Sequence, residues 1–346
     1  MYTTHRLGQI SLLASTLALF PLAASAAEST ASAAASASAP ATTPVAPEKK
    51  KPAAGGGGIG YEKSFTVTPQ GPWTGPRTPD GQPDIEGHWS NTISNHANFT
   101  DPQGGIPGDP SFERKQPGPR NERAPSRVSD PADGEIPYQP WARAKQQEFL
   151  NYFFNPIKPE YIEPLARCAP AGVPKSFYWH GYEIRQYPGY VVIFFSSGTR
   201  VIHLDGKPHL PSNIKLWNAD SRGHWEGNTL VVDVTNSNGK ARFSRTGDFA
   251  SENATFQEKY IFANDGKRYT YQTVVTDPTV YTRPFTVTIP ARRYTLDDKP
   301  NGWHFEVYIN KRDAKGKGGT PTIEREERIC IENNGGFGQA DHGAKK

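Results

Sequence analysis

The stretch RGHWEGNTLVVDVT, Arg222 to Thr235, decides the fold of this chain. After its Gly-Asn pair, Leu230, Val232 and Val234 alternate with residues that include Asp233. Successive side chains leave opposite faces of a strand, so this alternation predicts a strand with one aliphatic face and one face that carries Asp233. The Gly-Asn pair predicts a tight turn, and the stretch as a whole predicts a β-hairpin.

The same kind of pattern recurs from Glu183 onward, with Gly-containing turns between many of the runs. The predicted strands are 183–186, 190–196, 199–203, 228–235, 254–262, 268–276, 285–293, 303–310 and 324–332. Consecutive strands of this kind must close or stack in order to bury their edges. The length of the region suits a closed or nearly closed antiparallel barrel of about eight strands, whose interior is filled by side chains or holds one small ligand.

A single helix is predicted ahead of these strands. The run WARAKQQEFLNYFF, 141–154, follows Pro140, and proline is favoured at the first position of a helix. The segment 73–138 is rich in Pro, Gly, Asn and Asp, and apart from a short strand at 85–91 it shows no sustained periodicity. We therefore expect residues 61–160 to form a long Pro/Gly-rich arm with one flanking helix, and residues 161–333 to form the barrel domain.

The N-terminal end of the chain indicates export. Residues 1–26 have a basic start, a short apolar core and an Ala-Ser-Ala cleavage pattern, which is typical of a signal peptide. Residues 27–60 and 334–346 have the composition of a flexible linker and a flexible tail, and no later run is long enough for a membrane helix. The expected location is periplasmic or secreted.

Charge argues against a nucleic-acid partner. The formal net charge is +4, of which residues 1–60 carry +2 and Lys345 and Lys346 carry the other +2. The folded part, 61–344, is therefore close to neutral, whereas nucleic-acid binding needs basic residues that cluster on one face.

The chain contains two cysteines, Cys168 and Cys330. In an exported protein such a pair favours one disulfide, which here would link the segment before the barrel to its last strand. A catalytic or metal-bound thiol is the alternative, although two cysteines without a nearby partner make a poor zinc site.

Several phrases together resemble a large and mostly uncharacterised family of exported bacterial proteins. They are TPDGQPDIEGHWS (78–90), IPYQPWARAKQQE (136–148), PLARCAPAGVP (164–174), GHWEGNTLVVDVT (223–235) and DPTVYTRPFTV (277–287). Members of that family typically read PDLSGVW, IPYQPWAAA, ARCLPAGVPR, GRWEGDTLVVDTT and DPxxYTKPWT, so this chain departs from the pattern at Asn228 and Phe285. The Gly87-His88-Trp89 triplet also resembles the first strand of lipocalins, which implies a lipocalin-like barrel. The resemblance implies no particular reaction.

Three titratable residues are candidates for acid/base catalysis: His209, Asp233 and Glu258. His209 follows a predicted strand end, and the two carboxylates could form a pair if both project into the barrel, where burial raises a carboxyl pKa. Other interpretations stay open. His203, Asp205 and His209 could be ordinary turn residues or a metal triad, or His209 could be a general base that Asp205 orients. Asp233 and Glu258 could form structural ion pairs.

Five further residues are candidates for contacts with a substrate: Arg185, Tyr187, Trp225, Tyr281 and Arg283. Aromatic rings and guanidinium groups suit an aromatic or sugar-like molecule, although strand aromatics more commonly form the core. No nucleophile elbow, phosphate loop, dinucleotide fingerprint or zinc-protease motif occurs, so we expect no cofactor and no metal. The predicted function is a small-molecule site in a β-barrel that supports cofactor-free lyase or hydrolase chemistry. The alternative is a non-catalytic ligand-binding or structural module of the cell envelope.

Overall fold

The computed structural model describes residues 70–91, 98–102, 119, 124–179, 181–195 and 198–293, together with the backbone of 308–310 and 322–324. These residues belong to one compact unit, Pro52–Lys346. The predicted signal peptide, the predicted linker, the part of the predicted arm before residue 70, the C-terminal tail and Cys330 lie outside the described residues.

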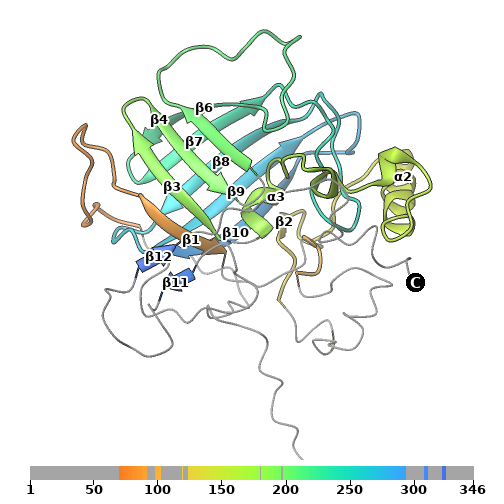
Figure 1. Ribbon diagram of the computed structural model, residues 1–346, viewed down its shortest axis with the longest axis horizontal. Helices are drawn as coiled ribbons and strands as arrows, with labels where there is room; N and C mark the ends of the chain where they lie inside the picture. Colours follow the sequence, from red (N-terminus) through yellow and green to blue (C-terminus); the bar gives the residue numbers. More distant parts are fainter. Residues whose placement is uncertain are drawn as a thin grey trace, which may run out of the picture. The chain divides into compact units, whose positions relative to one another are not determined.

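Nine strands close into a barrel in the order β1-β3-β4-β5-β6-β7-β8-β9-β10 and back to β1 (Figure 1). They are β1 (Gly87–Asn91), β3 (Tyr182–Tyr187), β4 (Tyr190–Phe195), β5 (Gly198–His203), β6 (Asp220–Glu226), β7 (Thr229–Thr235), β8 (Thr255–Phe262), β9 (Arg268–Thr276) and β10 (Phe285–Arg293). The predicted barrel is thus confirmed. It has nine strands because β1, which we placed in the N-terminal arm, pairs with both β10 and β3 and closes the ring.

One pairing departs from the expected antiparallel order. The predicted hairpin forms as expected, with β6 and β7 paired from Asp220 to Glu226. However, β5 and β6 run parallel and pair only at Ile202–Ser221 and His203–Arg222. Parallel neighbours need a crossover connection, and residues 204–219 supply it.

Strand directions define two ends of the barrel. All neighbouring pairs in the barrel except β5–β6 are antiparallel. The β3–β4, β6–β7 and β8–β9 turns therefore lie at the same end, which we call the hairpin end. The longer β7–β8 and β9–β10 connections lie at the opposite end, which we call the loop end.

The interior of the barrel is filled by side chains. The strands show alternating burial, and their buried faces contribute to one hydrophobic cluster that includes Ile184, Ile193, Val232 and Val287. The short helix α3 (Lys175–Trp179) adds Phe177, whose fully buried ring stacks on Tyr271 with centroids 4.3 Å apart. Among the described residues, side chains therefore occupy the barrel interior around Phe177 and leave no large chamber for a ligand there.

The flanking elements agree with the sequence in part. Helix α2 (Pro140–Asn151) confirms the predicted helix, and it packs on the loop end, where Gln146 donates to the Thr246 carbonyl and Trp141 to the Thr279 carbonyl. The three-residue strand β2 (Val128–Asp130) was not predicted and pairs with β10. The predicted strands 303–310 and 324–332 lie mostly outside the described residues, where only β11 (Tyr308–Asn310) and β12 (Thr322–Glu324) are seen, paired with each other.

Two short 3-10 helices, η2 (Pro159–Tyr161) and η3 (Pro164–Arg167), link α2 to α3. Among the described helices, none has the length and apolar character that crossing a membrane requires.

Candidate functional site

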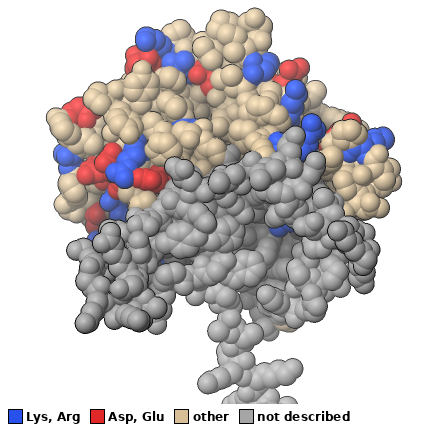
Figure 2. Space-filling model, in the orientation of Figure 1, with Lys and Arg blue, Asp and Glu red and all other residues tan. Residues whose placement is uncertain are grey.

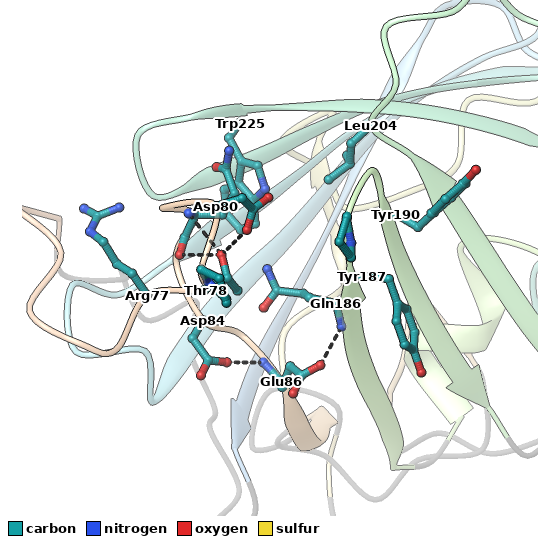
Figure 3. Close-up of a pocket in the computed structure, with 13 residues that line it drawn as sticks. Arg77, Thr78, Asp80, Asp84, Glu86, Gln186, Tyr187, Tyr190, Leu204 and Trp225 are labelled. Carbon is teal, nitrogen blue, oxygen red and sulfur yellow. Dashed lines mark hydrogen bonds between the residues drawn. The ribbon is translucent and has the colours of Figure 1, made fainter.

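A pocket of about 370 Å³ lies at the hairpin end of the barrel (Figure 3). A loop within residues 77–86 forms one side, the turn from Gln186 to Tyr190 forms another, and Leu204 and Trp225 complete the wall. The site therefore combines the N-terminal phrase TPDGQPDIE with three strand ends that are distant in sequence. Its volume lies within the range that holds small organic ligands.

The 77–86 loop is held against β3 by three hydrogen bonds to one residue, Gln186. The Gln186 carboxamide accepts from the Ile85 N–H at 2.7 Å and donates to the Pro83 carbonyl at 3.0 Å. The Gln186 N–H in turn donates to Glu86 Oε1 at 2.8 Å. Because β1 begins directly after this loop, closing the barrel through β1 also places the loop beside the pocket.

Aromatic rings and carboxylates lie on different sides of the β3–β4 hairpin. Tyr187 and Tyr190 are paired across the hairpin and are partly exposed, and Figure 3 shows their rings on the side that faces away from the 77–86 loop. The Gln186 side chain points to the loop, and successive side chains leave opposite faces of a strand. Asp80, Asp84 and Glu86 come from the loop, so the pocket offers hydrogen-bond acceptors on its loop side.

Two of these carboxylates keep one oxygen without a hydrogen bond among the described residues. Asp80 Oδ1 accepts from the Thr78 hydroxyl at 2.6 Å, and Asp84 Oδ1 accepts from the Glu86 N–H at 3.0 Å. The second oxygen of each makes neither a hydrogen bond nor an ion pair in the part of the chain that the structure describes. Arg77 is the one basic residue of the wall; it donates to the Gly81 carbonyl at 2.7 Å, and Figure 3 shows its guanidinium turned away from the aromatic rings.

Trp225 contributes an unused donor to the same wall. Its indole Nε1 is buried and has no hydrogen-bond partner within the described residues. A buried N–H without a partner costs on the order of 1 to 3 kcal/mol.

The three predicted catalytic residues are not brought together. Asp233 is exposed on the outer face of β7, because the alternation that buries Val232 and Val234 turns it outwards. Glu258 is fully buried inside the barrel. The prediction that Asp233 and Glu258 form a carboxylate pair inside the barrel is therefore wrong, because Asp233 lies on the outside.

Glu258 belongs to a buried ion pair. Arg200 donates to both of its oxygens, at 3.1 and 2.8 Å, and Tyr271 donates to it at 2.8 Å. Burial disfavours the charged guanidinium, but Glu258 and Tyr260 outweigh this effect and raise the pKa of Arg200. The structural ion pair that we considered for Glu258 is thus present, with Arg200 as its partner.

His209 lies on the crossover connection and contacts a different acid from the one expected. Its Nδ1 is 2.8 Å from Asp220 Oδ2, and Asp220 also accepts from the Leu210 N–H and from Arg222 Nε. Burial opposes ionisation of Asp220, yet these three contacts outweigh it and hold the pKa below its usual value. Asp205 instead binds Lys207 and Arg222, and His203 packs against the Tyr190 ring.

The predicted substrate contacts divide into two groups. Tyr187 and Trp225 line the pocket. Arg185 does not, and its guanidinium is paired with Glu183 and approaches Glu86.

Tyr281 and Arg283 belong to the β9–β10 connection at the loop end. Tyr281 is buried and donates to the Phe249 carbonyl, and Arg283 pairs with Asp130. The pocket lies at the other end of the barrel, so these two residues do not contribute to it.

Sequence reasoning missed the acidic side of the pocket. We predicted turns at 78–83 and no candidate residue there, although carboxylates occur at 80, 84 and 86. That signal is weak by itself, because Asp-Gly is also a good turn pair. Only the β1–β3 pairing shows that this phrase lies beside the β3–β4 hairpin.

The described residues contain no group of three or more His, Cys, Asp or Glu side chains arranged to hold a metal ion. Acidic and basic side chains are interspersed on the face shown in Figure 2, which has no extended basic area among the residues coloured there. No known protein family, no curated protein and no solved structure matches this chain.

Proposed function

We propose that this protein is an exported, periplasmic or secreted, small-molecule-binding protein whose ligand occupies the pocket at the hairpin end. The observation that carries the proposal is the pocket itself: it measures about 370 Å³ and is lined by the 77–86 loop with two incompletely bonded carboxylates, by the β3–β4 turn, and by Trp225, whose indole N–H has no partner among the described residues. A concave site with an apolar wall and a few polar groups is the usual form of a ligand site. An aromatic or sugar-like compound of modest size fits this description.

The charge of the wall argues against a ligand that carries an acid group. Three carboxylates face one arginine there, and the arginine is engaged with a backbone carbonyl. Arg185 and Arg283, which we had expected to bind an acid group, are both paired with protein carboxylates. A carboxylate on the ligand would therefore meet three like charges against one guanidinium.

Lyase or hydrolase chemistry is a second candidate function, favoured by one observation. Asp220 is held ionised and contacts His209 Nδ1, an arrangement that orients a histidine so that its Nε2 can accept a proton. His209 would then be the general base, positioned by Asp220, with no contribution from Asp233 or Glu258. To test this role, the turnover of any compound that the wild-type protein converts is measured for His209→Ala and Asp220→Asn. Full activity in both variants would exclude His209 as the general base.

The binding proposal is tested by filling the pocket. Neutral glycosides and aromatic alcohols are titrated by calorimetry into the wild-type protein and into Leu204→Trp, which places an indole in the pocket wall. Val201→Trp is the matched control, because Val201 is exposed on the outside of β5 and does not line the pocket. We expect at least one compound to bind the wild type and the control but not Leu204→Trp. Equal binding by all three proteins would place the ligand elsewhere.

A further inference from the structure

We propose that residues 76–84 form a lid on the hairpin-end pocket and that the Gln186 side chain is the latch that keeps this lid closed. The inference rests on the proposed function, because it concerns access to the same pocket. It assigns a way of controlling that access and does not depend on the class of ligand.

The lid is a turn structure that is held together by its own contacts. Its two legs meet at the antiparallel bridge between Arg77 and Pro83. The Thr78 N–H donates to the Gln82 carbonyl at 2.9 Å, and the Gly81 N–H donates to the Thr78 carbonyl at 2.8 Å. Three prolines within the lid fix further backbone angles. Because these hydrogen bonds close within the lid, it can move as one body without losing them.

One side chain joins the lid to the barrel. Among the described residues, no hydrogen bond or ion pair links 77–82 to a strand, and 79–81 are exposed. The Gln186 carboxamide donates to the Pro83 carbonyl at 3.0 Å and accepts from the Ile85 N–H at 2.7 Å. These two bonds hold the second leg of the lid against β3, so Gln186 acts as a latch.

The chain is fixed on both sides of the lid. Before it, the Thr74 N–H donates to the Asn264 carbonyl at 2.8 Å, and Asn228 Nδ2 donates to the Gly71 carbonyl at 2.7 Å. These bonds attach the chain to the β8–β9 and β6–β7 turns. After the lid, the fully buried Ile85 side chain and the pairing of β1 hold the chain in the barrel. Motion is therefore confined to the segment that lines the pocket.

The strength of the latch sets how often the lid opens. Release of the Gln186 side chain breaks its two hydrogen bonds, and each bond of this kind changes an equilibrium constant by about two- to twelvefold. The open state is thus a minor population that loss of the latch enlarges. Removal of both bonds should raise this population at least about fivefold.

Thiol labelling in the pocket wall measures the opening. Leu204→Cys places a thiol in that wall, and its rate of reaction with Ellman's reagent follows the open population. The wild-type protein gives the background from its own cysteines. Gln186→Leu removes both latch bonds at similar size and should raise the labelling rate at least about fivefold. Gln257→Leu is the matched control, since Gln257 is exposed on the outer face of β8 and does not line the pocket.

A second thiol position distinguishes lid opening from a general loosening of the fold. Val232 is fully buried inside the barrel and does not line the pocket. Gln186→Leu should therefore leave the labelling of Val232→Cys unchanged. An equal rise at both thiol positions, or no rise at Leu204→Cys, would overturn the inference.

Hydrogen exchange tests the same opening in the unaltered protein. The Ile85 N–H is bonded to the latch, whereas Ile193 lies in β4 between β3 and β5, and both side chains are fully buried. Release of the latch frees the Ile85 N–H alone, so this amide should exchange at least about tenfold faster than that of Ile193. Equal exchange would mean that the lid separates only when the whole barrel unfolds, and the lid would be refuted.

The lid and the proposed function can fail separately. If Gln186→Leu leaves the labelling of Leu204→Cys unchanged while Leu204→Trp abolishes ligand binding, the lid is refuted and the pocket remains the ligand site. If Gln186→Leu raises the labelling but Leu204→Trp changes no binding, the lid stands and the proposed ligand site is refuted.

Discussion

The sharpest test of the architecture is the buried ion pair between Arg200 and Glu258. Arg200 is 2% exposed and Glu258 is not exposed at all, and two hydrogen bonds of 3.1 and 2.8 Å join them. Arg200 also donates to Ser221 and Tyr260, so several hydrogen-bond acceptors surround its positively charged guanidinium. Glu258→Gln keeps the shape of the side chain but leaves that charge buried without its counter-ion.

The expected cost follows from this geometry. Two charge-assisted hydrogen bonds of about 1.5 to 3 kcal/mol each are lost or weakened, and breaking a buried pair from one side typically costs about 3 to 5 kcal/mol. We therefore expect Glu258→Gln to lower the free energy of unfolding by about 3 to 5 kcal/mol, a large part of the stability of an ordinary domain.

Urea unfolding, followed by tryptophan fluorescence and by circular dichroism, measures this loss. Arg200→Met should also destabilise the protein, and the double variant should lose less than the sum of the two single losses, since no unpaired charge then remains. Arg283→Met is the matched control: its ion pair with Asp130 is 51% exposed on both sides, so we expect a change below about 1 kcal/mol. The reasoning is refuted if Glu258→Gln and Arg283→Met cost the same.

Three further predictions use other parts of the structure. Gly247→Ala should lower the free energy of unfolding by more than about 1 kcal/mol, because Gly247 has φ +92° and a Cβ would lie 2.7 Å from a carbonyl oxygen of α2; Gly206→Ala, with φ +68° and open space, should cost less in the same urea titration. The pKa of Asp220 is lowered, so its contribution to stability is present above its ordinary pKa of 3.8 and is lost as the pH falls through the folded-state value; the difference in stability between wild type and Asp220→Asn should shrink on acidification, and a constant difference would contradict this. Non-reducing peptide mapping should find Cys168 linked to Cys330, and reduction should destabilise the protein by roughly 4 to 5 kcal/mol in the chain-entropy estimate for so long a loop; two free thiols would exclude the link.

The class of fold follows from local sequence. Alternation in the stretches that form β7 to β10, with glycine turns between most of them, predicted those strands with boundaries that differ from the structure by a residue at most. Strand formation depends on backbone preference and on which face is apolar, and both properties are written in neighbouring residues. The same holds for α2, which starts at its proline as expected.

The pocket at the hairpin end depends on strand pairings that no local sequence pattern predicts. Sequence reasoning marked Tyr187 and Trp225, but it contained no reason to place Asp80 and Asp84 at the same pocket, because that requires β1 to close the ring beside β3. Strand order is decided by the free energy of burying the edges of the whole sheet, to which every strand contributes.

Whether an acidic side chain faces the barrel interior or the solvent also depended on the tertiary structure. Glu258 and Asp233 both occupy apolar strands, yet one is buried beside Arg200 and the other is exposed. A carboxylate can enter the barrel only where a counter-ion meets it there, and Arg200 reaches Glu258 from β5, 58 residues away in sequence. The sequence alone therefore determined that this chain forms a β-barrel, whereas the tertiary structure decided which of its charged groups are buried in ion pairs and which are exposed at the surface.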